Sequence, residues 1–249
     1  MQKTEGKEKS GRRLGSLCLD LLFPRRCPVC HAPAPPGLGI CPECRGRLPR
    51  IRTARCHVCG KPVQDGERIC PDCRKNPHVF TRGKGVFLYD ETMRSAMSYF
   101  KYKGRREYGE VLAEEVFQEA ESSLLDWGVR AVLPVPIHKK RLRERGYNQA
   151  EVLSAKIAEL SGLMHLPKVL LRTKKTPPLK ELTPEKRREA LAAAMELGEP
   201  APKVPVLLVD DIYTTGATLD AAAAVLLTGG TPAVFFLTVC IGGGFMVQY

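Results

Sequence analysis

Eight cysteines in the first third of the chain form four pairs with the spacing of metal ligands. They are Cys27 and Cys30, Cys41 and Cys44, Cys56 and Cys59, and Cys70 and Cys73. Each member of the second set follows its counterpart by 29 residues, as Cys56 follows Cys27. A Cys-x-x-Cys knuckle directs two thiolates at one metal ion, and two knuckles complete a tetrahedral zinc site. Because nothing in the sequence indicates secretion, two zinc ions are favoured over disulfides.

The pairing of the knuckles stays open at this point. Sequential pairing joins the first four cysteines on one ion and the last four on another, whereas a cross-braced arrangement of alternate knuckles is equally regular. Closed all-cysteine sites leave no position for substrate, so both ions are expected to be structural and to supply folding energy. Neither site needs the neighbouring His31, His57 or His78. The nine arginines between positions 25 and 74 fit nucleic-acid contact and packing against a partner domain equally well.

A second chemical motif occupies residues 206–218, VLLVDDIYTTGAT. Its apolar start is typical of a buried parallel strand, and ligands bind beyond the carboxyl ends of such strands. Asp210 and Asp211 fall at that end, where adjacent carboxylates can accept hydrogen bonds from a vicinal diol such as that of ribose. The following turn supplies backbone amides and hydroxyls where the next helix begins, which suits a phosphate. The motif therefore predicts a site for a phosphorylated sugar.

The segments around these motifs alternate between strand and helix patterns. Strands are expected at 86–89, 131–136, 168–171, 204–209 and 233–239, and helices at 91–102, 107–125, 149–161 and 216–227. Residues 172–184 read as a long basic loop, and 184–195 as partly helical. Such alternation implies an α/β fold with a parallel sheet flanked by helices. Three regions follow: a disordered basic tail at 1–13, a double zinc ribbon at 14–82 and the α/β domain at 83–249.

The whole chain has 249 residues and a formal net charge of +12. Such a charge favours polyanionic partners, which are nucleic acid, phosphorylated substrates or acidic membrane surfaces. No apolar run reaches the roughly 18 residues that a membrane span needs. A cytoplasmic location is therefore expected.

Residues 206–218 resemble the 5-phosphoribosyl-1-pyrophosphate (PRPP) motif of type I phosphoribosyltransferases. The resemblance implies that fold, with Asp210 and Asp211 as catalytic carboxylates that bind the ribose hydroxyls. The 5′-phosphate would be held by Thr214, Thr215, Gly216, Ala217 and Thr218. A second loop in that family holds pyrophosphate and Mg2+, and residues 133–149 take its place here. The basic side chains in that loop are Lys139, Lys140, Arg141, Arg143 and Arg145.

The order of the motifs resembles, more narrowly, the ComF family of competence-associated phosphoribosyltransferase-like proteins. The zinc region is followed by 101–104 (KYKG), 134–149 (PVPIHKKRLRERGYNQ) and the DDIYTTGAT segment. This resemblance implies a role on incoming single-stranded DNA, with DNA-uptake proteins as partners. The chain departs from the family pattern in residues 172–195, where inert types stand at Leu179, Ala190, Ala193 and Met195. Thr214 replaces an aspartate of purine-salvage relatives, which argues against purine salvage.

Two kinds of function fit these observations. One is a Mg2+-dependent phosphoribosyl transfer in DNA uptake, or in nucleotide metabolism with an acceptor that the sequence does not identify. The other is a non-catalytic module that binds single-stranded nucleic acid with the same fold, as the charge of +12 would allow.

Overall fold

The computed structural model describes residues 24–173 and 193–242. The predicted tail 1–13 and the departures at Leu179 and Ala190 lie outside these ranges. The chain divides into two compact units, Met1–Leu48 and Pro49–Tyr249. The division falls between the two cysteine sets, whereas the sequence analysis placed it after both. The second set is thus part of the same unit as the sheet.

A five-stranded parallel sheet forms the centre of the larger unit, in the order β1-β7-β6-β2-β3. The strands are β1 (Arg82–Leu88), β2 (Ala131–Pro134), β3 (Met164–His165), β6 (Val206–Tyr213) and β7 (Val234–Ile241). Every residue of β2 and β7 is buried, because both faces of the sheet are covered. The predicted α/β fold with a parallel sheet flanked by helices is therefore confirmed.

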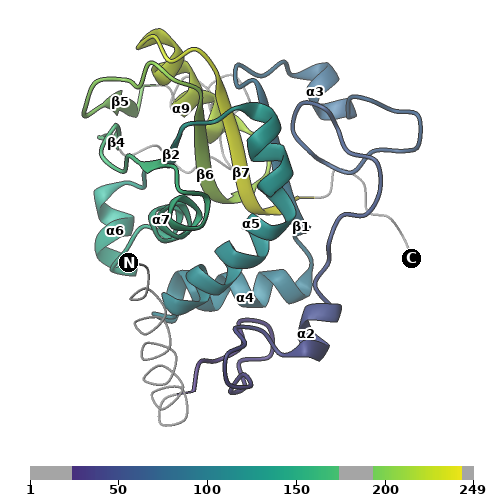
Figure 1. Ribbon diagram of the computed structural model, residues 1–249. Helices are drawn as coiled ribbons and strands as arrows, with labels where there is room; N and C mark the ends of the chain where they lie inside the picture. The colour runs from purple at the N-terminus through teal and green to yellow at the C-terminus, as the bar shows by residue number, and fades with distance from the viewer. Residues whose placement is uncertain (1–23, 174–192, 243–249) are drawn as a thin grey trace, which may run out of the picture. The chain divides into compact units, whose positions relative to one another are not determined.

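Helices cover both faces of this sheet (Figure 1). On one face lie α4 (Glu91–Tyr102), α5 (Glu107–Trp127) and α7 (Gln149–Ser161), and on the other lies α9 (Ala217–Thr228). The helix starts follow the sequence, since Asp90 accepts a 2.8 Å bond from the Met93 amide and Asn148 caps the Ala150 amide. Gly162 ends α7 in the left-handed conformation.

Smaller elements complete the described structure. The strands β4 (Leu170–Arg172) and β5 (Met195–Leu197) form an antiparallel pair, in which Met195 is buried. Short helices α2 (Pro42–Gly46) and α3 (Pro71–Lys75) each begin directly after the first cysteine of a knuckle and contain its second cysteine. None of the described helices is long and apolar enough to cross a membrane.

Two differences from the expected elements concern the functional motifs. The strand β6 does not end at Val209 but continues to Tyr213, because its pairing with β7 extends to Tyr213 and Ile241. The expected loop after β2 contains a helix, α6 (Lys139–Arg145), which starts at the His138 cap and ends at Gly146. Both differences place the predicted ligand residues on regular elements, and such elements hold side chains more rigidly than loops.

Candidate functional site

The two predicted ligand segments meet at one edge of the sheet. The strands β2 and β6 are neighbours, with Pro134 opposite Val209, so their carboxyl ends lie together. The turn before α9 follows β6, and α6 follows β2. This edge is where α/β sheets bind ligands.

Asp210 and Asp211 lie near the end of β6. An Asp210 carboxylate oxygen accepts a 2.8 Å bond from the Asp211 amide. The other carboxylate, that of Asp211, forms a 2.8 Å ion pair with Lys101 at the end of α4. Burial, and then the charge of Asp211, raise the pKa of Asp210 to about 7. A carboxyl group in this state is ready to lose its proton when a cation or a ribose diol arrives.

Two cations, Lys101 and Arg172, act on the Asp210 carboxyl group. The positive charges of Lys101 and Arg172 oppose the rise in the Asp210 pKa. Burial, followed by the charge of Arg141, lowers the pKa of Arg172. The charge of Arg172 on β4 therefore interacts both with Asp210 and with Arg141 of α6. Such a mixture of charges suits a ligand that carries both hydroxyls and phosphates.

The five basic residues predicted to hold pyrophosphate all lie on α6, and they divide into two kinds. Lys139, Lys140, Arg141 and Arg143 are exposed. Arg145 is half-buried, donates to the Gln149 side chain at 2.9 Å and to the Tyr102 hydroxyl at 3.1 Å, and stacks over the Tyr102 ring. Arg145 therefore positions α6, and the other four cations remain accessible to an anion.

The turn predicted to hold the 5′-phosphate joins β6 to α9. Thr214 and Thr215 are exposed, and Gly216 precedes α9 with φ +79°. A β-carbon at this glycine would lie 2.8 Å from a ring carbon of His78. Only glycine fits both the backbone angle and this close contact.

Sequence reasoning did not assign a role to Lys101 or His78. Lys101 lies 110 positions before Asp211, and His78 was set aside as a spectator of the zinc sites. The KYKG resemblance pointed to the Lys101 segment without giving a partner. The ion pair with Asp211 supplies that partner.

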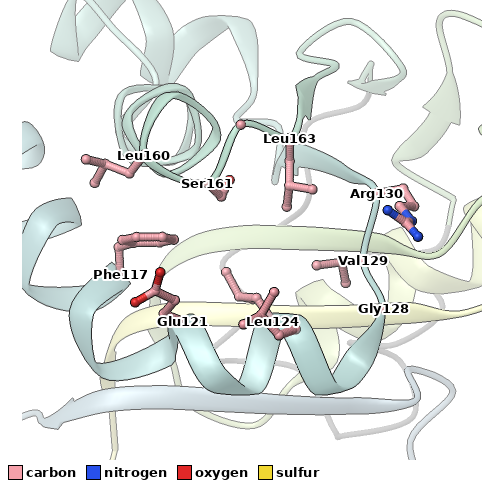
Figure 2. Close-up of a pocket in the computed structure, with 11 residues that line it drawn as sticks. Phe117, Glu121, Leu124, Gly128, Val129, Arg130, Leu160, Ser161 and Leu163 are labelled. Atoms are coloured by element: carbon pink, nitrogen blue, oxygen red, sulfur yellow. The ribbon is translucent and has the colours of Figure 1, made fainter.

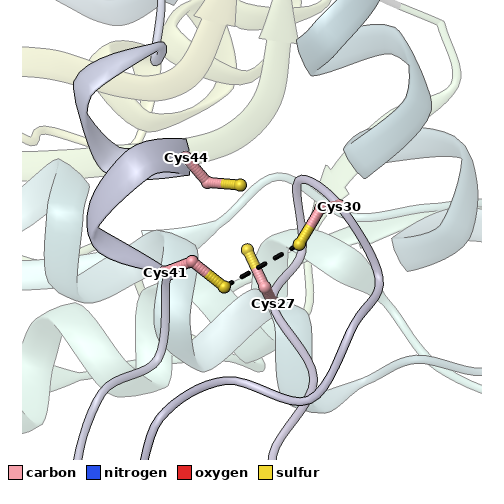
Figure 3. Close-up of side chains that lie close together, drawn as sticks. All are labelled: Cys27, Cys30, Cys41 and Cys44. Carbon is pink, nitrogen blue, oxygen red and sulfur yellow. Dashed lines mark hydrogen bonds between the residues drawn. The ribbon is translucent and has the colours of Figure 1, made fainter.

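The cysteines gather into two separate clusters. Cys27, Cys30, Cys41 and Cys44 form one, and Cys56, Cys59, Cys70 and Cys73 form the other, with all sulfurs of a cluster within 4.8 Å of one another. Figure 3 shows the first cluster, where the two knuckles point their sulfurs inward. The pairing is thus sequential, one of the two arrangements that the sequence allowed.

The distances within the clusters fit zinc. Tetrahedral zinc with bonds of about 2.3 Å places neighbouring sulfurs about 3.8 Å apart. The Cys30 and Cys41 sulfurs are 3.8 Å apart, and those of Cys59 and Cys70 are 3.7 Å apart. A disulfide would require about 2.05 Å. The two four-cysteine sites therefore fit two structural zinc ions.

The two zinc sites differ in burial. All four cysteines of the second site are buried, whereas Cys30 of the first site is exposed. The second site belongs to the same apolar cluster as Phe80, Tyr213 and Phe236. It is consequently built into the core of the α/β unit.

A separate hollow of about 460 Å³ lies at the opposite edge of the sheet, between the ends of α5 and α7. Figure 2 shows its lining, which is mostly apolar, with Glu121, Ser161 and Arg130 as the polar groups. None of the predicted ligand residues contributes to it. The candidate site is therefore the carboxyl edge of the sheet.

Comparisons with known proteins agree with the motifs. The family model of the double zinc ribbon domain matches residues 18–74. Competence protein ComFC of Bacillus subtilis is 30% identical over 155 residues, which are 61% of this chain and 60% of that protein. DNA utilization protein YhgH of Salmonella typhimurium is 28% identical over 224 residues, which are 88% of this chain and 98% of that protein. These relatives and the double zinc ribbon support the resemblance of the motifs to the ComF family.

The solved structures to which the chain shows similarity include phosphoribosyltransferases. An adenine phosphoribosyltransferase is 15% identical with a TM-score of 0.37, covering 59% of this chain and 75% of its own. Orotate phosphoribosyltransferase from Aeropyrum pernix is 15% identical with a TM-score of 0.33, and the match covers 62% of this chain and 84% of that protein. The sheet and the two cysteine clusters confirm the predicted α/β fold with a parallel sheet and a zinc ribbon, and the family model agrees with the ribbon.

Proposed function

We propose that this protein binds PRPP with Mg2+ at the carboxyl edge of its sheet and serves in DNA uptake. The observation that carries the proposal is the arrangement at the end of β6. Two adjacent carboxylates, the start of α9 and the cations of α6 surround one edge of the sheet. These three features match the diol, the 5′-phosphate and the pyrophosphate of PRPP.

Each part of the ligand then has its own partners. Asp210 and Asp211 accept hydrogen bonds from the ribose 2′- and 3′-hydroxyls. The 5′-phosphate is held by Thr214, Thr215, Gly216, Ala217 and Thr218, where backbone amides and the positive end of α9 favour an anion. Lys139, Lys140, Arg141 and Arg143 balance the charge of the pyrophosphate, and Arg145 keeps α6 in place.

A transfer reaction at this site would break the bond between ribose C1 and the pyrophosphate oxygen, with both electrons leaving on the pyrophosphate. The ribose would carry positive charge in the transition state, and the carboxylates of Asp210 and Asp211 stabilise that charge. Bound Mg2+ would neutralise part of the charge on the leaving group. The acceptor then supplies the electron pair for the new bond to C1.

The link to DNA uptake rests on the relatives and on charge. Two relatives are named for competence, and another for DNA utilization. The net charge of +12 favours a polyanion. Cytoplasmic single-stranded DNA, and the proteins that deliver it, are therefore the proposed partners.

Calorimetric titration with PRPP and MgCl2 tests the ligand. We expect binding by the wild-type protein and a loss of at least about 100-fold in the variant Asp210→Asn/Asp211→Asn, because both diol acceptors are altered. The matched control is Asp126→Asn, an exposed aspartate at the end of α5. If the wild type does not bind, or if both variants bind alike, this function is wrong.

The same preparations test the proposed binding of single-stranded DNA. A labelled single strand should bind with an affinity that falls steeply with salt, because neutralised phosphates release counterions. DNA binding that is indifferent to salt would contradict the role proposed for the positive charge.

A further inference from the structure

The ring of His78 lies in an enclosed position beside the proposed phosphate turn. Its side chain is only 3% exposed. Its Nδ1 lies 2.7 Å from an Asp220 carboxylate oxygen, and its Nε2 lies 3.3 Å from the Tyr213 hydroxyl. The second oxygen of Asp220 accepts a 3.0 Å bond from the Val79 amide. His78 and Val79 follow the second zinc ribbon, which is the segment 56–73 that carries the second cysteine cluster. Both residues therefore hold Asp220 in the first turn of α9.

These contacts enclose the turn from both ends. Tyr213 is the last residue of β6, and Asp220 lies in the first turn of α9, where its amide donates to the Gly216 carbonyl at 2.8 Å. A β-carbon at Gly216 would lie 2.8 Å from the His78 ring and 2.9 Å from the Tyr213 hydroxyl. The imidazole therefore packs directly against the backbone that is proposed to receive the phosphate.

The second zinc ribbon supports this packing from behind. The His78 ring stacks on Phe80 at 4.5 Å, and Phe80 and Tyr213 both pack on Phe236, at 4.8 and 5.0 Å. Tyr213 shares one apolar cluster with the four cysteines of the second site. Lys61 of the ribbon lies over the Tyr213 ring at 5.6 Å and is itself fixed by a 2.6 Å ion pair with Asp72.

The ribbon is also attached to the sheet by backbone contacts. The Gly83 amide of β1 donates to the Val58 carbonyl at 2.8 Å. A β-carbon at Gly60 would come within 2.7 Å of the Gly83 carbonyl oxygen. A ribbon held so closely to β1 can transmit its rigidity to the turn through His78 and Tyr213.

We infer that the second zinc ribbon positions the sugar-phosphate turn, and that His78 and Tyr213 are the positioning residues through which it acts. The inference rests on the proposed function for the identity of the ligand, but not for the packing itself. A backbone site for an anion works only if its amides are held in place before the ligand arrives. The zinc site thereby contributes to ligand affinity without contacting the ligand.

Hydrogen exchange of the amides between 213 and 220 tests the packing, and titration with PRPP and Mg2+ tests its effect. The variants are His78→Ala and Tyr213→Phe, the latter removing only the hydroxyl that contacts His78. We expect exchange at least about fivefold faster at this turn and affinity about tenfold weaker, with zinc content unchanged. The exposed histidine of the same ribbon supplies the matched control, His57→Ala, which should leave both measurements unchanged.

Rescue separates positioning from general stability. The side-chain amide nitrogen of His78→Asn can replace Nδ1 as the partner of Asp220, so this variant should regain much of the slow exchange. Unchanged exchange in the folded His78→Ala and Tyr213→Phe variants would overturn the inference, as would faster exchange throughout the sheet. If the wild-type protein binds no PRPP, the proposed function fails, while the exchange of the turn still decides whether His78 positions it.

Discussion

The ammonium group of Lys101 lies 2.8 Å from an Asp211 carboxylate oxygen, and both side chains are about 15% exposed. This ion pair joins the end of α4 to the end of β6, across 110 positions of sequence. It places a positive charge beside the two carboxylates that are proposed to bind ribose. The same charge opposes the rise in the pKa of Asp210.

Replacing Lys101 with methionine should shift the pH dependence of PRPP binding. The pKa of Asp210 is raised to about 7, first by burial and then by Asp211. Because ligand and Mg2+ favour the ionised carboxylate, affinity should rise with pH and level off above about 7. Lys101→Met removes a charge that lowers this pKa. The increase in PRPP affinity should therefore occur at a pH that is higher by about half a unit or more. Titrations from pH 5.5 to 9 measure the shift.

The matched control for this shift is Lys103→Met, an exposed lysine two positions further along. It carries the same charge change without the ion pair, so its pH profile should coincide with that of the wild type. If the affinity of Lys101→Met increases at a lower pH than that of the wild type, the electrostatic role given to this residue is contradicted.

Asp210→Asn should stabilise the folded protein while it weakens ligand binding. The folded pKa lies above the unfolded value, so the folded state holds an extra proton between about pH 4 and 7. Wild-type stability therefore falls as pH rises through this window. Asparagine does not titrate, and its side-chain oxygen can still accept from the Asp211 amide. Thermal unfolding should show no gain near pH 4 and a gain of at least about 3 °C at pH 8.

Asp126→Asn serves again as the control, because this aspartate is exposed. Its melting temperature should follow that of the wild type at every pH. A gain for Asp210→Asn that is the same at pH 4 and pH 8 would mean that burial of the charge is not its cause.

The elements that could be predicted from the sequence are those with strong local signals. The helix over 91–102 and the helix over 149–161, with its Asn148 cap, have the observed bounds, because capping residues and apolar spacing act locally. The helix α6 was missed because KKRLRER has no buried residue and so no apolar period. The strand β3 has only two residues, too few for any pattern.

The residues proposed for the site were predicted from the sequence only where they are contiguous. Residues 206–218 form one strand and turn, so their order alone indicated a phosphate site. Lys101, Arg172 and His78 come from three other elements, and their positions depend on how α4, β4 and the ribbon pack. The sequence left the pairing of the zinc knuckles open for the same reason. Tertiary packing, and not local pattern, determines those contacts.

The two zinc sites should differ in their effect on stability. Cys30 is exposed in the first site, whereas Cys59 is fully buried within the core cluster of the α/β unit. Cys30→Ser and Cys59→Ser should each bind one zinc ion per chain in place of two. Cys30→Ser should leave the main thermal transition within about 2 °C of wild type, while Cys59→Ser should lower it by about 10 °C or prevent folding. Zinc analysis and calorimetry measure both; equal destabilisation would show that the sites contribute alike.

Arg141→Ala should weaken PRPP binding far more than the binding of ribose 5-phosphate. Arg141 is exposed on α6, and its charge acts on Arg172, which in turn acts on Asp210. The proposed function places this side chain, on the helix that follows β2, at the pyrophosphate of the ligand. Ribose 5-phosphate has the same diol and 5′-phosphate but no pyrophosphate. We expect a loss of about tenfold for PRPP and less than about twofold for ribose 5-phosphate, measured by calorimetry.

The control for Arg141 is Arg94→Ala, an exposed arginine on α4 that changes the net charge by the same amount. Its affinities for PRPP and for ribose 5-phosphate should both stay near the wild-type values, since salt screens exposed charges that do not contact the ligand. An equal loss for both ligands in Arg141→Ala would place this residue at the 5′-phosphate instead. No loss for either would mean that α6 does not hold the pyrophosphate, and that its cations face another polyanion such as DNA.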